Sequence, residues 1–504
     1  MVGLFEREVL KPILKAIQTM SVNNAFYINN EYYTYNYLGL CVSKIRNAIR
    51  KHTDEMSCYG LAIHDDIETY AAILALWMEG KSYVPLHPNQ PIERNMNIIQ
   101  LVGLTNVIDS EENSVFDGSI VNVIDSRKLE EVEMELNNWK ETSEQDLAYI
   151  LFTSGSTGVP KGVQISRQNL GAFMESFWDT GIKIEETDRC LQIFDLTFDV
   201  SVQSYLVALT RGACVYTVPY GEIKYLNAAA LINEHKITFG AMAPSMLMYL
   251  RPYFNEIDAS SLKACILTAE ACPVKLMEEW FDCAKNVDLY DFYGPTEATI
   301  YCTYYKLSRN RENLSLNGII SIGKPMKNVE AVIIDEANNI LATNEKGELC
   351  VSGLQVTQGY WNNLEKNKTS FLDLNVNGET KRFYRTGDLC YMHDDGNIMY
   401  SGRIDQQAKI QGFRVELGEI EFYAREFYVR ESRTIAIAFE NSTGLTEIAL
   451  FIEGVKQAAD DLLVYLRSKL PSYMIPTKIL FIEKFPLNKS EKVDRNELKQ
   501  IIMK

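Results

Sequence analysis

The 504-residue sequence predicts an α/β protein with a large multi-sheet N-terminal body and a small α+β C-terminal domain. Strand-like apolar runs alternate with amphipathic helical patterns through most of the first 400 residues, which is typical of α/β proteins. The chain is too long for one hydrophobic core. The pattern of expected helices and strands changes to α+β near residue 405, and about 100 residues are enough for a small domain. We therefore place the body at residues 1–403 and a mobile lid domain at 404–504.

Composition and charge exclude several classes of protein. A hydrophobic content of 46% and a charged content of 23% are typical of soluble globular proteins. The net charge of −17 argues against nucleic acid or an anionic membrane as a general partner. The ten cysteines form no C-x-x-C pair and show no zinc spacing, which favours reduced thiols. Glu6, Arg7 and Glu8 precede any signal-like segment, and the longest apolar run, 70–78, is too short to span a membrane. We expect a cytoplasmic monomer that is not inserted into a membrane.

The most informative segment of the chain is 147–162. An apolar, β-prone run at 147–152 leads into a loop of small hydroxyl and glycine residues that ends at Lys161. Glycines expose backbone N–H groups and hydroxyls add donors, so this loop suits an anion such as a triphosphate. It is not a Walker loop, because Gly162 follows the lysine and Pro160 blocks a helix start. The alternative is a Ser/Gly-rich surface loop without a ligand.

The remaining elements follow from local patterns. A short strand at 163–165 leads to Ser166, a predicted N-cap, and then to a helix that runs to about Trp178. Runs at 236–240 and 263–267 predict buried strands ending in ligand-facing loops. In the C-terminal domain the pattern predicts helices at 418–427 and 459–470 and strands at 434–438 and 448–451.

The loop at 147–162 resembles the signature of the adenylate-forming (AMP-binding) enzymes. This superfamily includes acyl-CoA synthetases, luciferases and the amino-acid adenylation domains of nonribosomal peptide synthesis. Eight more motifs resemble those of the family and follow in family order: YVPLHP (83–88), FDVS (198–201), YGPTE (293–297), GEL (347–349), YRTGD (384–388), GRID (402–405), GFRVELGEIE (412–421) and KVDR (492–495). Over nearly its whole length the chain is similar to free-standing amino-acid adenylation enzymes such as D-alanine–carrier-protein ligases. The resemblance implies the adenylate-forming architecture of a body and a lid.

The resemblance implies an ATP site, in which a carboxylate attacks the α-phosphorus although both partners are negative. Cationic and N–H donors that cancel this repulsion then supply most of the catalysis. Thr296 would donate to the α-phosphate, Glu297 would bind Mg²⁺, and Tyr293 would stack on adenine. Asp388 would accept from both ribose hydroxyls, and Arg403 would donate to ribose or phosphate. The implied ATP-binding set is Thr153, Ser154, Gly155, Ser156, Thr157, Gly158, Lys161, Asp291, Phe292, Tyr293, Gly294, Thr296, Asp388, Arg403 and Lys492.

The alternatives to these assignments are structural. The segment 293–297 alone is compatible with an ordinary turn after a strand. Asp388 and Arg403 alone are compatible with solvated charges or a salt bridge.

The lid is expected to contribute to both steps of the reaction. By resemblance, Lys492 would bridge the substrate carboxylate and the α-phosphate, and with Thr296 and Glu297 it completes the expected catalytic set. The family usually has Asn-Gly before this lysine, whereas here Ser490-Glu491 precedes it, and the glutamate would partly offset its charge. The alternative is one more exposed lysine.

A hinge is expected at the start of the lid. Asp405 occupies the hinge position of the family, where a few residues absorb the backbone change. Gly412 would line a tunnel for the phosphopantetheine thiol of a carrier protein.

The expected amino-acid site centres on Asp199, which by resemblance pairs with the substrate α-ammonium. The alternative is a helix N-cap. The remaining pocket residues, aligned by motif, are Val200, Gln203, Ala241, Ile266, Thr268, Phe292, Ile300 and Tyr301. The bulk of Phe292, Ile300 and Tyr301 favours a small side chain, and D-alanine suits the free-standing length. However, Asp199, Val200 and Gln203 also resemble the lining of proline-activating domains, and Thr268 replaces the cysteine typical of D-alanine ligases.

The sequence therefore predicts a ligase that activates a small amino acid with ATP and Mg²⁺. The product would be an aminoacyl-AMP, with release of pyrophosphate, and the aminoacyl group would then pass to the phosphopantetheine thiol of a separate carrier protein. Three alternatives remain: an adenylation enzyme for another amino acid such as proline, an acyl- or aryl-CoA synthetase, and an inactive amino-acid or nucleotide binder.

Overall fold

The computed structural model describes residues 2–51, 56–116, 120–155, 160–219, 223–310, 312–428, 433–454, 459–487 and 493–503. The chain divides into two compact units. Unit 1 comprises Met1–Pro88, Ile99–Leu151 and Gly162–Ile404, and unit 2 comprises Asn89–Ile98, Phe152–Lys161 and Asp405–Lys504. Along the chain the change of unit thus falls between Ile404 and Asp405. Two short earlier segments, one of which holds the glycine-rich loop, group with the C-terminal residues.

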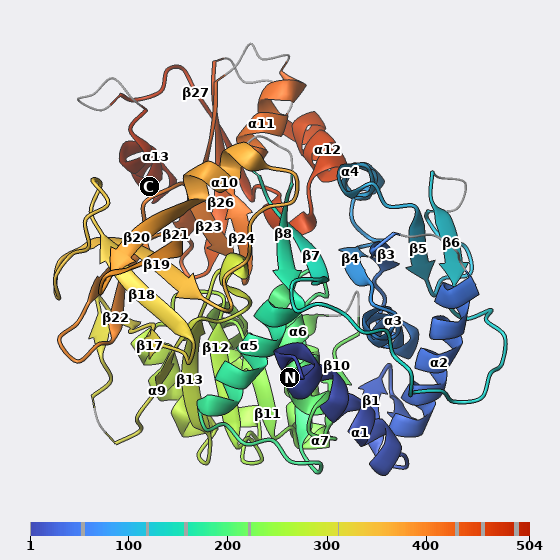
Figure 1. The fold of residues 1–504 in the computed structure, drawn as a ribbon. Coiled ribbons are helices and arrows are strands. Elements are labelled where there is room, and N and C mark those ends of the chain that lie inside the picture. The colour runs from blue at the N-terminus through green and yellow to red at the C-terminus, as the bar shows by residue number, and fades with distance from the viewer. Residues whose placement is uncertain are drawn as a thin grey trace. The chain divides into compact units, whose positions relative to one another are not determined.

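A nine-stranded sheet forms a large part of unit 1 (Figure 1). Its strands are β1 (Asn24–Ile28), β2 (Glu31–Thr34), β9 (Arg189–Gln192), β10 (Cys214–Thr217), β11 (Phe239–Met242), β12 (Ala264–Thr268), β13 (Asp288–Tyr293), β14 (Thr303–Lys306) and β17 (Lys324–Pro325). The order is β17-β14-β13-β12-β11-β9-β10-β1-β2. The strands from β1 to β13 in this order pair in parallel, whereas β2, β14 and β17 are antiparallel to their neighbours. The carboxyl ends of the parallel strands therefore meet at one edge.

A six-stranded sheet lies mainly in the same unit. It contains β3 (Cys58–Ala62), β4 (Ser82–Leu86), β5 (Asn106–Asp109), β6 (Asn122–Asp125), β7 (Leu147–Thr153) and β8 (Lys161–Ser166), in the order β6-β5-β3-β4-β7-β8. β7 and β8 flank the glycine-rich loop and extend from unit 1 into unit 2.

Helices of unit 1 lie on both faces of the nine-stranded sheet and against the other sheets of the unit. They are η1 (Glu6–Leu10), α1 (Lys11–Thr19), α2 (Tyr35–Lys51), α3 (Ile67–Met78), part of α4 (Ile92–Val102), α5 (Arg167–Asp179), α6 (Asp199–Leu209), α7 (Lys224–His235), α8 (Pro244–Leu250), α9 (Val274–Cys283) and α10 (Leu364–Ser370). One core cluster includes α3, α5 and α6, and a second includes α7, α8 and α9. Along β12, Ile266 belongs to the first cluster and Cys265 and Leu267 to the second, because successive side chains on a strand point to opposite faces.

The later part of unit 1 is antiparallel. The strands β18 (Val329–Ile334), β19 (Gly347–Gly353), β20 (Phe371–Val376), β21 (Glu379–Met392) and β22 (Ile398–Arg403) form one sheet in which every pair is antiparallel. The expected strand–helix alternation thus does not extend through this region. One sequence signal was present, because Asn377-Gly378 joins β20 to β21 with positive φ at both residues, as a tight hairpin requires.

The C-terminal part of unit 2 is an α+β domain. Its elements are β23 (Gln407–Ile410), β24 (Phe413–Glu416), α11 (Leu417–Phe427), β25 (Thr434–Glu440), β26 (Thr446–Glu453), α12 (Ala459–Lys469), β27 (Lys478–Ile482) and α13 (Arg495–Met503). The predicted helices and strands between 418 and 470 are present, whereas the β23–β24 hairpin, β27 and α13 were not predicted. The fold class is confirmed: a large multi-sheet α/β body and a small α+β C-terminal domain.

Single residues determine where two of the predicted elements begin. Ser166 caps α5, and its hydroxyl accepts from Asn169 N while the Asn169 side chain accepts from Ser166 N, so the N-cap prediction is confirmed. The strand predicted at 236–240 begins only at Phe239, because Lys236 adopts a left-handed φ of 51° that ends α7.

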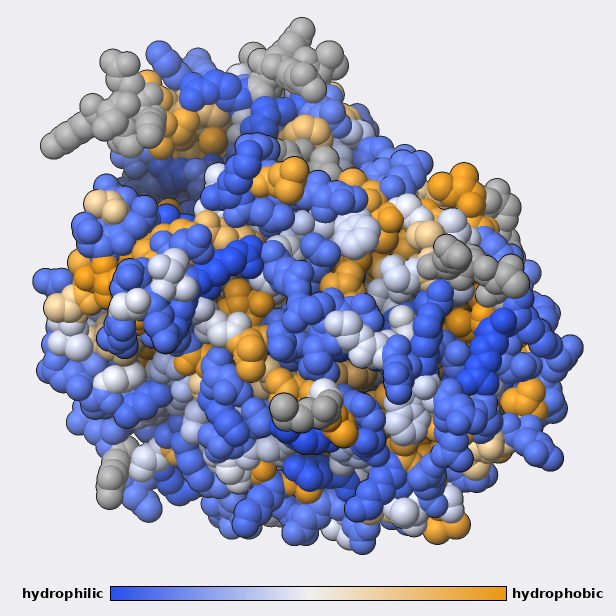
Figure 2. Space-filling model, viewed as in Figure 1, coloured by the Kyte–Doolittle hydropathy of each residue, from blue (hydrophilic) through white to orange (hydrophobic). Residues whose placement is uncertain are grey.

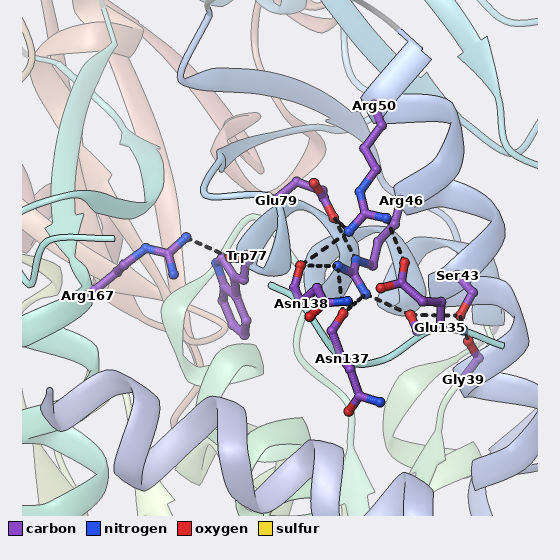
Figure 3. A network of polar contacts seen from close by, with 10 residues as sticks. All are labelled: Gly39, Ser43, Arg46, Arg50, Trp77, Glu79, Glu135, Asn137, Asn138 and Arg167. Carbon is purple, nitrogen blue, oxygen red and sulfur yellow. Dashed lines mark hydrogen bonds and ion pairs between the residues drawn. The ribbon is translucent and has the colours of Figure 1, made fainter. Parts of the chain in front are cut away.

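The long connection between β6 and β7 is held by a buried arginine (Figure 3). Arg46 is 1% exposed and donates to Glu79 Oε1 at 2.7 Å and to the Glu135 carbonyl at 2.7 Å. A further bond joins it to the Asn138 carbonyl at 3.2 Å. In the same view Arg167 donates to the Trp77 carbonyl. A connection without helices or strands must satisfy its carbonyls elsewhere, and Arg46 does so here.

The surface shows no large apolar face in the view of Figure 2, where hydrophobic side chains are interspersed among hydrophilic ones. None of the helices in the described part of the chain is both long and apolar enough to cross a lipid bilayer.

Asp65, which follows β3, gives a prediction for pH dependence. Its Oδ2 is buried and accepts no hydrogen bond from the described residues. Burial raises its pKa to about 6 from 3.8; the nearby Thr217 hydroxyl and the charge of Lys224 oppose this effect, and the charge of Asp66 adds to it. Because the folded state binds this proton more tightly, Asp65 lowers stability as pH rises from about 4 to 6, by about 3 kcal/mol in total. We expect Asp65→Asn to raise the thermal unfolding midpoint at pH 7.5 and to change it little at pH 4.

Asp179→Asn, at the exposed end of α5, is the matched control and should leave the midpoint unchanged at both pH values. An equal shift for Asp65→Asn at pH 4 and pH 7.5 would contradict the titration argument.

Candidate functional site

The predicted amino-acid pocket residues of the sheet lie on neighbouring strands of unit 1. Ala241 and Ile266 are cross-strand partners in β11 and β12, and Thr268 pairs with Phe292 across β12 and β13. The rings of Phe292 and Tyr301 are 5.1 Å apart. All five side chains are buried. The fold therefore brings together residues that are up to 60 positions apart in the chain.

Helix α6 adds the remaining predicted pocket residues. Asp199 is its first helical residue and Phe198 is the N-cap, with no side-chain capping bond, so the alternative of an aspartate N-cap is wrong. Gln203 lies one turn further along, and its Oε1 accepts from the Tyr301 hydroxyl at 3.4 Å. Asp199 and Gln203 share one face of the helix, and Val200 is also buried at its start.

Two tyrosines lie within electrostatic reach of Asp199. Burial raises the pKa of Tyr149 and Tyr301 well above the ordinary value, and the Asp199 charge raises it further at both. The Tyr149 hydroxyl has no hydrogen-bond partner among the described residues. Sequence reasoning missed Tyr149, because it lies within an apolar strand and only the packing places it near Asp199.

A strained turn at residues 299–300 leads into the predicted pocket residues Ile300 and Tyr301. Thr299 and Ile300 have φ of 56° and 72°, which is costly for β-branched side chains, about 1–3 kcal/mol each. Gln355 holds the turn: the Thr299 hydroxyl donates to its carbonyl at 2.5 Å, and its Nε2 donates to the Tyr301 carbonyl at 2.7 Å. At Gly294 a Cβ would lie 2.4 Å from the Ile300 carbonyl oxygen, so only glycine permits this approach. Sequence reasoning missed Gln355.

Three predicted nucleotide-site residues form a second cluster of unit 1. Asp388 on β21 is the cross-strand partner of Arg403 on β22, whose Nη1 lies 2.9 Å from Asp388 Oδ1. The Tyr293 hydroxyl donates to the other carboxylate oxygen at 2.5 Å. Burial raises the pKa of Tyr293 well above its ordinary value, and the Asp388 charge adds to this effect. The carboxylate keeps further lone pairs for other donors.

Hydrogen bonds and an ion pair join the motifs at 347–349 and 384–388. The Glu348 carboxylate accepts from Arg385 Nε at 2.8 Å through one oxygen and from Gly387 N at 3.0 Å through the other. The Thr386 hydroxyl donates to the Leu349 carbonyl at 2.8 Å. These bonds position the strand that carries Asp388.

Glu297 lies in the short helix η3 (Thr296–Ala298), just after β13. Its side chain is fully buried, and its Oε1 accepts from the Tyr360 hydroxyl at 2.6 Å. The described residues contain no group of three or more histidine, cysteine or carboxylate side chains placed to hold a metal ion. A single buried carboxylate nevertheless suits Mg²⁺, which usually combines one or two carboxylates with substrate phosphates and water. Sequence reasoning missed Tyr360.

The phosphate-loop residues lie in unit 2, where the described ones are Thr153, Ser154, Gly155 and Lys161. Ser156, Thr157, Gly158 and Lys492, together with Ser490 and Glu491, lie outside the described residues.

Asp405 and Gly412 also belong to unit 2. Asp405 opens its C-terminal segment and accepts from Gln407 N at 3.1 Å, and Gly412 has a φ of 84° in the β23–β24 turn. Asp291 is buried on β13, beside Phe292.

The loop contacts the segment 412–421 within unit 2. The Ser154 hydroxyl donates to the Arg414 carbonyl at 3.1 Å and accepts from Glu416 N at 3.0 Å. Lys161 Nζ lies 2.7 Å from Glu416 Oε1, and Gly155 N donates to Glu419 Oε2 at 3.1 Å. The two acidic residues thus meet the donors expected to hold phosphate.

Residues 15–361 match the AMP-binding enzyme family, and the chain belongs to this family. It is 32% identical to tyrocidine synthase 1 of Brevibacillus parabrevis over 462 residues, which cover 90% of this chain and 41% of that protein. It is 30% identical to zwittermicin A synthase ZmaJ of Bacillus cereus over 455 residues, which cover 87% of this chain and 84% of that protein. The chain thus spans less than half of the length of tyrocidine synthase 1, and it covers 7% of tyrocidine synthase 3.

The fold is similar to that of solved adenylation domains. The structure of the Vibrio cholerae adenylation domain AlmE in complex with glycyl-adenosine-5'-phosphate has a TM-score of 0.87 and 24% identity, and the match covers 100% of this chain and 98% of that chain. The artificially fused adenylation–PCP di-domain NpsA-ThdA from Klebsiella oxytoca has a TM-score of 0.83 and 24% identity, covering 94% of this chain and 93% of that chain.

Gln355 gives a prediction that separates it from its neighbours. Gln355→Leu leaves the Tyr301 carbonyl without its side-chain donor and removes one of the two hydrogen bonds that hold the strained turn, while the bond from Thr299 to the backbone carbonyl of residue 355 remains. We expect the free energy of unfolding to fall by about 1–3 kcal/mol, measured by urea denaturation. Gln358→Leu, an exposed position in the same loop, is the control and should change stability by less than about 0.5 kcal/mol. Equal effects of the two substitutions would contradict the bracing role.

Proposed function

We propose that this chain activates an amino acid with ATP as an aminoacyl-AMP and transfers the aminoacyl group to the phosphopantetheine thiol of a carrier protein. The observation that carries this proposal is the buried carboxylate of Asp199 among the aromatic and apolar pocket residues of α6, β11, β12 and β13. A buried anion in a ligand pocket selects a cationic ligand group, and the α-ammonium of an amino acid is such a group. Fatty and aryl acids lack it, which disfavours an acyl- or aryl-CoA synthetase.

The nucleotide end of the proposal rests on the second cluster of unit 1. Asp388, held by Tyr293 and Arg403, would accept from the ribose hydroxyls, and Asp291, Phe292 and Gly294 lie on or directly after the same strand as Tyr293. The phosphates are assigned to Thr153 through Lys161, with Thr296 on the α-phosphate. Glu297 would hold Mg²⁺ together with phosphate oxygens, and the ion would neutralise charge on the triphosphate.

Charge neutralisation would drive the chemical step. A substrate carboxylate oxygen would form a bond to the α-phosphorus, the bond from that phosphorus to the oxygen of the β-phosphate would break, and pyrophosphate would leave. Lys161 and the loop N–H groups would stabilise the leaving pyrophosphate, while Lys492 would stabilise the approaching carboxylate. In the second step the carrier thiolate attacks the mixed anhydride and AMP leaves. The lid would carry Lys492 away between the steps, with Asp405 as hinge and Gly412 beside the thiol path.

A small amino acid is proposed as the substrate, with D-alanine first and proline second. Phe292, Ile300 and Tyr301 are all buried, which limits the space for a side chain. Glycine is included among the amino acids to be tested, because the AlmE structure contains a glycyl adenylate. The structure of NpsA-ThdA, in which an adenylation domain is artificially fused to a PCP domain, supports a carrier domain as acceptor.

Asp199 provides the test of the amino-acid assignment. We expect wild-type protein to catalyse amino-acid-dependent ATP–pyrophosphate exchange in a panel of D- and L-amino acids with simple carboxylic acids as controls. Asp199→Asn should reduce exchange by about 100-fold, since truncating one partner of a buried charge pair costs about 3 kcal/mol. Binding of AMP, measured by calorimetry, should be unchanged. Unchanged exchange in Asp199→Asn would remove the amino-acid assignment, and exchange with simple acids alone would favour an acyl-CoA synthetase.

The hinge assignment is tested by restricting the backbone at Asp405. Asp405→Pro should slow transfer to a holo-carrier protein by at least about tenfold and leave pyrophosphate exchange within about threefold of wild type, because only the second step needs the rotated lid. Asp405→Ala, which keeps backbone freedom, is the matched control and should behave as wild type. If Asp405→Pro left both rates unchanged, the hinge would lie elsewhere.

A further inference from the structure

Two carboxylates from the C-terminal segment occupy the donors of the phosphate loop in unit 2. Lys161 Nζ lies 2.7 Å from Glu416 Oε1, and the two side chains are 10% and 12% exposed. Gln407 Nε2 donates to the same oxygen at 2.6 Å. The loop lysine, expected to hold phosphate, is thus paired with an internal anion.

Glu419 is held between the loop and a buried arginine. Its side chain is fully buried; Oε2 accepts from Gly155 N at 3.1 Å, and Oε1 lies 2.9 Å from Arg94 Nη1. Arg94 lies in the first turn of α4, in the short segment Asn89–Ile98 that belongs to unit 2, and is 8% exposed. Burial raises the pKa of Glu419, while Arg94 and the Gly155 N–H oppose this effect.

This geometry is one that a phosphate group also satisfies. A glycine-loop N–H, a forked guanidinium and a lysine ammonium are the donors that bind phosphate oxygens in proteins. Each N–H bond engages one acceptor at a time, so a bound phosphate and the Glu419 carboxylate exclude each other at Gly155. If Glu419 left, Arg94 would remain as a buried cation without its anion, which is strongly unfavourable unless a second anion replaces it.

We propose that Arg94, Gly155 N–H and Lys161 form one anion subsite for the terminal phosphates of ATP, and that Glu416 and Glu419 occupy it as internal competitors when no polyphosphate is bound. The identity of the ligand rests on the proposed function. Arg94 is the new member of the site, because no motif of the sequence pointed to it. The contacts of Glu416 and Glu419 with the loop then form only after pyrophosphate has left, because the carboxylates and pyrophosphate use the same donors.

The sign of one measured change separates a binding role of Arg94 from a purely structural one. If Arg94 only fastens Glu419, removing it loosens the competitor, and pyrophosphate binds as well as before or more tightly. If Arg94 itself receives phosphate, removing it weakens pyrophosphate binding although the competitor is also loosened.

Calorimetric binding of inorganic pyrophosphate and of AMP to the full chain tests the proposal. We expect Glu416→Gln and Glu419→Gln each to tighten pyrophosphate binding by about fivefold or more, because each removes a competing anion. Arg94→Met should weaken it by about fivefold or more, and Arg94→Lys, which keeps the charge without the fork, by less. AMP binding should be unchanged in all four, since AMP lacks the terminal phosphates. Glu426→Gln, an exposed position on α11, removes the same charge without touching the loop and should match wild type.

Three outcomes would overturn the proposal. The first is an unchanged pyrophosphate affinity in both Glu416→Gln and Glu419→Gln. The second is a tightening in Glu426→Gln equal to theirs, and the third is unchanged or tighter pyrophosphate binding in Arg94→Met. Thermal unfolding checks that each variant is folded. If Glu419→Gln or Arg94→Met does not fold, Glu416→Gln and Arg94→Lys carry the test. The proposed function fails separately, if wild type binds AMP and pyrophosphate but activates no amino acid.

Discussion

The cost of burying carboxylates governs how the functional segments of this protein meet. A buried carboxylate without donors costs several kcal/mol, and several of the buried or nearly buried carboxylates are matched by donors from another part of the chain. Asp388 is matched by Tyr293 and Arg403, about 95 and 15 residues away in sequence. The other matched pairs are Glu297 with Tyr360, Glu348 with Arg385, and Glu419 with Arg94. These bonds select one arrangement of loops that hydrophobic burial alone would leave loosely specified.

The turn at residues 299–300 adds backbone strain to this pattern. Thr299 and Ile300 hold left-handed conformations that their β-branched side chains disfavour, and Gln355 supplies the hydrogen bonds that keep them there. Gly294 allows the preceding turn to pack directly against the same backbone. The turn thereby places Tyr301 with its ring 5.1 Å from that of Phe292, and in the proposed function a turn held in this way would favour discrimination between small side chains.

The phosphate loop connects chemistry with conformation in unit 2. Its donors, Gly155 N–H and Lys161, are satisfied by Glu419 and Glu416 in the present arrangement. Carboxylate and phosphate oxygens compete for the same N–H and ammonium donors because both are compact anions. A site of this kind needs no additional switch, since its occupancy by an external or an internal anion already distinguishes two states of the protein.

The fold class, the family and several helices and strands could be predicted because they depend on local patterns and short motifs; Ser166 as the cap of α5 is an example. The antiparallel sheet of 329–403 was missed although Asn377-Gly378 marked one of its hairpins. Tyr149, Gln355, Tyr360 and Arg94 carry no motif, because each acts through a partner far away in the chain. The sequence by itself thus determined which side chains are available for nucleotide and amino-acid chemistry. Only the tertiary structure decided which donor satisfies which buried carboxylate, because that pairing depends on distances that folding alone creates.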